Sequence, residues 1–194
     1  MIHGVLARRV ALVMAMCAGA IAAHAAEPKA PAAAPASQEP RVFTLSSVFA
    51  NGRPIPPDHA CGGANTSPVL TWIDSPAKTK SFAVIADDPD APGKTWVHWV
   101  VFNIPPTNHQ LSAAIPAEPQ LPDGTRQGTN DFGATGYGGP CPPSGMHRYL
   151  FKLYALDTML SLEPGATKNQ LEQAMQQHIL AQTQLVGTYQ KGQQ

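Results

Sequence analysis

Two segments of the chain combine polar side chains with a backbone made stiff by proline and open by glycine. The first is Asp87–Pro92, with the sequence DDPDAP, and the second is Gly138–Tyr149, with the sequence GGPCPPSGMHRY. An apolar segment, residues 96–104, lies between them and contains His98. Carboxylates, histidines and a tyrosine hydroxyl can exchange hydrogen bonds with a ligand, and glycine lets the main chain approach it closely. The two segments therefore predict a small polar binding site.

We expect residues 96–104 to form a strand, in which side chains alternate between the two faces. His98 would then share its face with four apolar side chains: Trp96, Val100, Phe102 and Ile104. A lone histidine in such a row more often packs than binds, and its ring nitrogens need partners because an unpaired buried polar group is costly. Asp88 and Asp90 lie just upstream, and a carboxylate could orient His98 and keep it protonated, which would favour an anion.

The second segment offers similar groups. Residues 138–139 and 142–145 are predicted to form a compact loop whose free amides lie close to a ligand. His147 and Tyr149 share one face of the strand that follows. Arg148 points the other way, and two roles are open to it, an ion-pair group or a residue at the rim of the pocket.

Two histidines, a tyrosine hydroxyl and loop amides suit a phosphate or a carboxylate, and tryptophan and proline walls suit the carbon atoms of a lipid headgroup. A hydrolase would use His98 and His147 for acid–base chemistry and Ser144 as nucleophile, but the chain has no G-x-S-x-G elbow around that serine. The spacing of Asp88, His98 and His147 matches no common zinc pattern. We predict a binding site with no metal and no other cofactor, and no enzymatic activity.

The start of the chain is typical of a secretory signal. Arg8 and Arg9 precede an apolar run, residues 10–23, which is followed by a small-x-small site. We expect cleavage after Ala25 or Ala26. A retained transmembrane anchor is the alternative, but the apolar run is short for a bilayer span.

These observations divide the chain into a signal peptide, 1–25, an Ala/Pro-rich linker, 26–40, and one domain, 41–194. Removal of Arg8 and Arg9 leaves 11 basic residues against 13 acidic ones, a net charge of −2. Because no basic stripe remains, we expect no nucleic-acid partner. The mature protein is predicted to be soluble and periplasmic or secreted.

Cys61 and Cys141 are the cysteines of the predicted mature chain. Neither belongs to a CxxC motif, and an exported protein meets an oxidising environment in which paired cysteines form disulfides. A Cys61–Cys141 disulfide is therefore predicted, with two separate thiols as the alternative.

Short strands are expected because 20 prolines and 16 glycines interrupt the 194 residues. Two packed sheets are the natural arrangement for such strands in one domain. The candidate strands are 42–48, 69–72, 81–86, 97–104, 148–156 and 185–189.

One helix is predicted late in the chain, over residues 168–181. Thr167 and Gln170 form a capping-box pattern at its start. His178 lies on the apolar stripe of this predicted helix, so we interpret it as a partly buried packing residue and not as a ligand group.

Several motifs occur together and in a fixed order. Residues 65–72 follow the pattern N-x-S-P-x-L-x-W, residues 88–92 follow D-P-D-x-P, and residues 145–148 follow G-x-H-R. His98 and Asn103 lie in the strand between the last two, Asn103 within a V-x-N-I pattern. In combination these motifs resemble those of the phosphatidylethanolamine-binding protein family, in its bacterial Raf-kinase-inhibitor-like branch.

The resemblance covers residues 42–189 and implies a mainly β fold, with a central antiparallel sheet packed on a second sheet and a few short peripheral helices. It also implies an anion pocket with Gly138 at its entrance. Animal members of the family carry a helix at the C-terminus beside the pocket, whereas here the predicted helix precedes the final strand. The ligand-binding residues implied by the resemblance are Asp88, Trp96, His98, Gly138, Pro143, His147 and Tyr149.

Animal members bind phosphorylated headgroups, and they also bind kinases or other protein partners. We therefore expect an exported binding protein for a small phosphorylated or otherwise anionic ligand, such as a phospholipid headgroup, with partner binding coupled to it. The alternative is an interaction protein that inhibits a kinase or protease through its surface.

Overall fold

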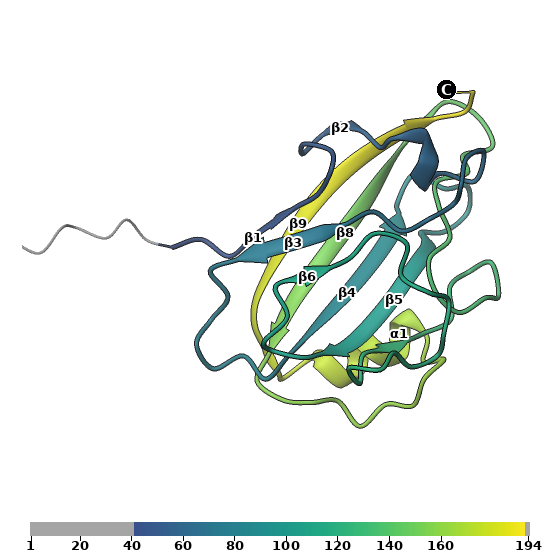
Figure 1. Ribbon diagram of the computed structural model, residues 1–194. Coiled ribbons are helices and arrows are strands. Elements are labelled where there is room, and N and C mark those ends of the chain that lie inside the picture. Colours follow the sequence, from purple (N-terminus) through teal and green to yellow (C-terminus); the bar gives the residue numbers. More distant parts are fainter. Residues whose placement is uncertain (1–40, 193–194) are drawn as a thin grey trace, which may run out of the picture. The chain divides into compact units, whose positions relative to one another are not determined.

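Residues 41–192, the part of the chain that the computed structural model describes, fold mainly as two β-sheets (Figure 1). The predicted signal peptide, 1–25, and the predicted linker, 26–40, lie outside the described residues. The smaller sheet contains β1 (Thr44–Ser46), β3 (Leu70–Ile73) and β6 (Gln110–Leu111), paired antiparallel in the order β1-β3-β6.

The larger sheet has six strands in the order β2-β9-β8-β4-β5-β7. Its neighbouring strands are antiparallel, except that β2 pairs parallel with β9. The strands are β2 (Arg53–Pro54), β4 (Ser81–Asp88), β5 (Trp96–Ile104), β7 (Arg126–Gln127), β8 (Met146–Leu156) and β9 (Ile179–Gln190). A short 3-10 helix, η1 (Pro57–His59), and one α-helix, α1 (Lys168–Met175), complete the described elements. The predicted mainly β fold is confirmed.

The strand β4 lies in the middle of the larger sheet, and all eight of its residues are buried. On one face, apolar side chains of the two sheets form a common core that includes Trp72, Phe82 and Trp99. On the other face, Leu171 and Met175 of α1 cover a second apolar cluster. Because both faces are covered, the sequence of β4 is continuously apolar from Phe82 to Ala86 and does not alternate.

The helix α1 is shorter than predicted. The capping box of Thr167 and Gln170 is present at its start, but the helix ends at Met175, and β9 already begins at Ile179. Continuous pairing of β9 with β8 overrides the local helical spacing of the apolar residues. His178 is consequently not on a helical stripe. Its side chain is half exposed and its Nδ1 lies 2.8 Å from a carboxylate oxygen of Asp157.

The strand β5 contains a bulge at His98. Residues 97 and 99 pair with consecutive residues of β4, which leaves His98 as the extra residue. Val100 and Phe102 consequently belong to the cluster beneath α1, whereas His98 packs against Tyr149 of the core between the sheets. The prediction that His98 shares a face with Val100 and Phe102 is therefore wrong, since a bulge breaks the simple alternation of a strand.

Candidate functional site

A cavity of about 330 Å³ lies where β4 ends and β5 begins. Asp88, the last residue of β4, pairs in the sheet with Trp96, the first residue of β5. The segment between these two strands and the loop that precedes β8 supply the remaining walls. The lining residues are Asp88, Ala91, Pro92, Trp96, His98, Phe132, Cys141 and Pro143.

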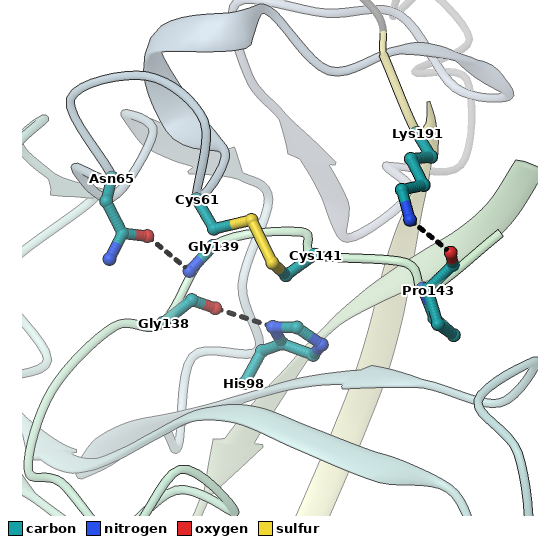
Figure 2. Close-up of a disulfide and its surroundings, with 8 residues drawn as sticks. All are labelled: Cys61, Asn65, His98, Gly138, Gly139, Cys141, Pro143 and Lys191. Atoms are coloured by element: carbon teal, nitrogen blue, oxygen red, sulfur yellow. Dashed lines mark hydrogen bonds between the residues drawn. A yellow bond between two sulfur atoms is a disulfide. The ribbon is translucent and has the colours of Figure 1, made fainter.

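His98 is held by a main-chain carbonyl. Its Nδ1 lies 2.6 Å from the carbonyl oxygen of Gly138, as Figure 2 shows. A carbonyl can only accept a hydrogen bond, so Nδ1 must be the donor. Burial lowers the pKa of His98 below its ordinary value near 6.5, although the Gly138 carbonyl and the charge of Asp88 act in the opposite direction. The ring is therefore neutral at neutral pH, and the prediction that a carboxylate keeps His98 protonated is wrong.

Asp88 orients a different histidine. Its Oδ2 lies 2.7 Å from Nδ1 of His147, and both side chains are buried. Its Oδ1 accepts a hydrogen bond of 2.8 Å from the backbone amide of Asp90. With both oxygens used, the carboxylate is fixed in the wall of the cavity.

Arg148 forms an ion pair with Asp90. Of its two predicted roles, ion-pair group or residue at the rim of the pocket, the geometry supports the first. The guanidinium contacts both carboxylate oxygens, at 2.6 Å and 2.9 Å, and the backbone amide of Arg148 adds a third hydrogen bond of 2.9 Å. The hydrogen bond from the guanidinium lowers the pKa of Asp90 from 3.8 to about 2. The pair joins the start of β8 to the segment that follows β4.

One buried hydrogen-bond donor near His98, the indole Nε1 of Trp96, has no partner within residues 41–192. The Tyr149 ring meets the His98 ring edge-on, with centroids 5.1 Å apart. Burial, and then the charge of Asp88, raise the pKa of Tyr149, so its hydroxyl stays protonated. Buried donors without partners are unusual in proteins and mark places where a ligand or water can bind.

The predicted disulfide between Cys61 and Cys141 is confirmed, with Cα atoms 5.4 Å apart. It joins the loop after η1 to the loop before β8 (Figure 2). The backbone amide of Cys61 also donates to the carbonyl of Pro140 at 3.0 Å. Cys141 lines the cavity, so this cross-link fixes part of its wall.

The glycine amides of the same loop are already used inside the protein. The amide of Gly138 donates to the carbonyl of His98 at 2.9 Å. That of Gly139 donates to Oδ1 of Asn65 at 2.7 Å, as Figure 2 shows. The prediction of free amides at Gly138 and Gly139 is therefore wrong, because buried amides are nearly always paired within the fold.

The structure brings the seven residues implied by the resemblance into one region, but not all onto the cavity wall. Those on the wall are Asp88, Trp96, His98 and Pro143. Those behind it are Gly138, which contacts His98, His147, which contacts Asp88, and Tyr149, which contacts the His98 ring. Gly138 lines a neighbouring cavity of about 250 Å³.

Sequence reasoning did not assign four wall residues to the site. Ala91 and Pro92 stand in the D-P-D-x-P motif, and Cys141 stands in the second polar segment, so a local signal existed for these three. Phe132 lies earlier in the loop that precedes β8, outside both polar segments, and packs edge-on against both Trp96 and His98. No local pattern in the sequence could have placed it here.

Two further results concern residues 41–192 as a whole. That part of the chain contains no helix long and apolar enough to cross a membrane. It also contains no group of three or more His, Cys, Asp or Glu side chains arranged to hold a metal ion.

Comparison with known proteins identifies the family of the chain. The family model described as phosphatidylethanolamine-binding protein matches residues 45–190. The chain belongs to this family. It is 54% identical over 138 residues to a UPF0098 protein of Methanothermobacter thermautotrophicus, covering 71% of this chain and 91% of the relative.

Two other relatives bear on the fold and on the cellular location. The crystal structure of CT736, a phosphatidylethanolamine-binding protein homologue from Chlamydia trachomatis, superposes with a TM-score of 0.71 at 42% identity, over 77% of this chain and 97% of that chain. A Mycobacterium tuberculosis relative named as lipoprotein LppC is 43% identical over 160 residues, which is 81% of this chain and 77% of that protein.

Proposed function

We propose that this protein is an exported binding protein whose cavity takes a small phosphorylated ligand, such as a phospholipid headgroup, and that it is not an enzyme. The observation that carries the proposal is the composition of the cavity wall where β4 ends and β5 begins. His98, the unpaired Nε1 donor of Trp96 and several apolar side chains line this cavity of about 330 Å³. This volume is at the lower end of the range for small-molecule sites, about 300–1,000 Å³.

The apolar part of the wall favours a ligand that has carbon atoms attached next to its phosphate group. Ala91, Pro92, Phe132 and Pro143 supply this part. Free phosphate would use only the polar part. A phosphorylated headgroup would use both, so it should bind more tightly than phosphate alone.

The hydrogen bonds of the cavity favour binding over catalysis. Asp88 is engaged through both oxygens, and Nδ1 of His98 is engaged by a carbonyl. Ser144, the nucleophile of the hydrolase alternative, is exposed and does not line the cavity. A nucleophile needs a base within hydrogen-bond reach, and Ser144 has no such contact within the described residues.

Export is supported by the cross-link and by one relative. Disulfides persist in oxidising compartments outside the cytosol, and Cys61 and Cys141 are bonded. The relative named as a lipoprotein is consistent with this location. The sequence of residues 1–25 has the features of a secretory signal.

Calorimetric titration of the mature protein with phosphate, phosphoethanolamine and glycerophosphoethanolamine tests the proposal. We expect the headgroup compounds to bind more tightly than phosphate, and we expect His98→Ala to abolish binding. His109→Ala is the matched control, because His109 is exposed and does not line the cavity. Binding that survives His98→Ala would locate the ligand elsewhere, and the absence of binding to all three compounds would favour the inhibitor-like alternative with a protein partner.

A further inference from the structure

Two polar groups on the cavity wall, a carboxylate and a ring nitrogen, are unfavourable to a fully ionised anion. The Asp88 carboxylate is part of the wall. Because Nδ1 of His98 donates to Gly138, the other ring nitrogen, Nε2, carries a lone pair in the neutral ring and can only accept a hydrogen bond. A carboxylate and a lone pair both repel a fully ionised anion.

The cationic side chains around the cavity are already engaged. Lys94 forms an ion pair of 2.9 Å with Asp131, and its Nζ lies 5.1 Å from the centroid of the Trp96 ring. Lys191 donates to the carbonyl of Pro143 at 2.8 Å (Figure 2). The charge of Lys94 is therefore balanced by Asp131, whereas Lys191 is held by a neutral carbonyl.

The remaining titratable groups packed around His98 come from neighbouring strands. From β4 these are Asp88 and, behind it, Asp87, whose charges both act on His98. From β8 they are Tyr149, which contacts the His98 ring, and His147, which is bound to Asp88. The loops contribute the Phe132 ring and the carbonyls of Gly138 and Gly139, in addition to the ion pair of Lys94 and Asp131.

Resting on the function proposed above, we propose that the cavity selects oxyanions that still carry a proton, such as a singly ionised phosphate monoester, over fully ionised anions. The P–OH group of such a ligand donates to Nε2 of His98, and its other oxygens accept from donors such as Nε1 of Trp96. The single remaining charge limits the repulsion from Asp88. Burial, which lowers the pKa of His98, keeps the acceptor form of the ring available.

Methyl phosphate and methyl sulfate provide a matched pair of probes. A phosphate monoester has a second pKa of about 6, so at pH 5 it is mainly a monoanion with one P–OH group. Methyl sulfate has nearly the same shape and the same single charge but no proton to donate. We expect methyl phosphate to bind at least about tenfold more tightly than methyl sulfate at pH 5, because the sulfate leaves the His98 lone pair unpaired.

The pH dependence of the same two affinities is the second readout. Above pH 6 the monoanion of methyl phosphate becomes rarer by about tenfold per pH unit, so its affinity should fall by about that factor between pH 7 and pH 8. The affinity of methyl sulfate should stay constant over this range. Titration of a group of the protein would instead change both affinities together, so methyl sulfate separates the two causes.

A charge-removing variant completes the test. Asp88→Asn keeps an acceptor for His147 but removes the repulsion, so methyl phosphate affinity at pH 8 should rise relative to wild type. Asp157→Asn removes a carboxylate that is not on the cavity wall and should change nothing. If Asp88→Asn does not fold, the comparison of methyl phosphate with methyl sulfate on the wild-type protein still tests the selection.

Two results would overturn the proposal in distinguishable ways. Equal binding of the two probes, or a methyl phosphate affinity that holds or rises from pH 6 to pH 8, would refute the selection and leave the anion-binding function standing. Failure of both probes to bind at any pH would refute the selection together with the proposed function.

Discussion

Nδ1 of His98 donates to the carbonyl of Gly138 across 2.6 Å, and this contact joins a sheet residue to a loop that is itself cross-linked. Gly138 is three residues before Cys141, whose disulfide to Cys61 holds the loop in place (Figure 2). The tautomer and the orientation of the His98 ring, and so the atom that it offers to a ligand, therefore depend on the loop and not on a neighbouring carboxylate.

Removal of the disulfide should weaken both the fold and ligand binding. In Cys61→Ser/Cys141→Ser the cross-link across 80 residues is lost, and we expect the free energy of unfolding to fall by about 2–5 kcal/mol. Affinity for phosphoethanolamine should also fall, because Gly138 is no longer pinned beside His98. Urea denaturation and calorimetry, each with and without reductant, measure the two effects. The double variant should be insensitive to reductant, and a wild type equally insensitive would contradict the prediction.

Gly139 should not tolerate alanine, although Gly62 should. A Cβ at Gly139 would lie 2.3 Å from the carbonyl oxygen of His59 and 2.7 Å from Oδ1 of Asn65, both too close. We expect Gly139→Ala to lower the free energy of unfolding by about 1–3 kcal/mol. Gly62 has no heavy atom within 4 Å of such a Cβ and lies next to Cys61, so Gly62→Ala is the control. Equal urea midpoints for the two variants would show that the loop adapts.

Local sequence patterns predicted the ends of an element well where neighbouring residues alone determine that end. Thr167 and Gln170 determine where α1 begins because both halves of a capping box lie within four residues. The end of α1 was missed because pairing of β9 with β8 decides it, and that pairing involves residues more than twenty positions away.

The candidate site shows the same division. The family resemblance implied Asp88, Trp96 and His98, which stand within eleven consecutive residues, and the cavity contains all three. The partner of His98 could not be predicted, since Gly138 is forty residues away and contributes only its carbonyl, an atom that every residue has. Phe132 was missed for a similar reason: its place depends on the course of a loop.

Asp90 provides a test of pH dependence. Folding lowers its pKa from 3.8 to about 2 through the hydrogen bond from Arg148. The ionised form is therefore the stabilising one: its contribution is complete above about pH 4 and is lost as the pH falls through about 2. An NMR titration should give a pKa of about 2 in the wild type and a value nearer 3.8 in Arg148→Gln.

The matched control for this titration is Arg41→Gln, because Arg41 pairs with Asp74 and not with Asp90. The stability difference between wild type and Asp90→Asn should likewise shrink as the pH is lowered from 4 to 2. A pKa of Asp90 that is unchanged in Arg148→Gln would mean that another group lowers it.

Asp87 and Asp88 are consecutive but have opposite surroundings, because successive side chains of β4 point to opposite faces. Asp88 faces the cavity, whereas Asp87 contacts two amines, Nζ of Lys152 at 2.9 Å and Nζ of Lys168 at 2.5 Å. Its side chain is 0% exposed, and Lys168 belongs to α1. The carboxylate thus joins β4, β8 and the helix.

Removal of this carboxylate should be among the more damaging single changes in the domain. Asp87→Ala leaves two partly buried ammonium groups side by side without their counter-ion, and breaking a buried ion pair in this way costs about 3–5 kcal/mol. Lys168→Met should cost less, because Lys152 still neutralises Asp87. Asp157→Ala is the control, since Asp157 and its partner His178 are both about half exposed and such surface pairs contribute about 0–1 kcal/mol. Urea denaturation gives the loss of unfolding free energy for each of the three variants. If Asp87→Ala loses no more than Asp157→Ala, the prediction is contradicted. The two lysines would then move to solvent while α1 keeps its contact with the sheet.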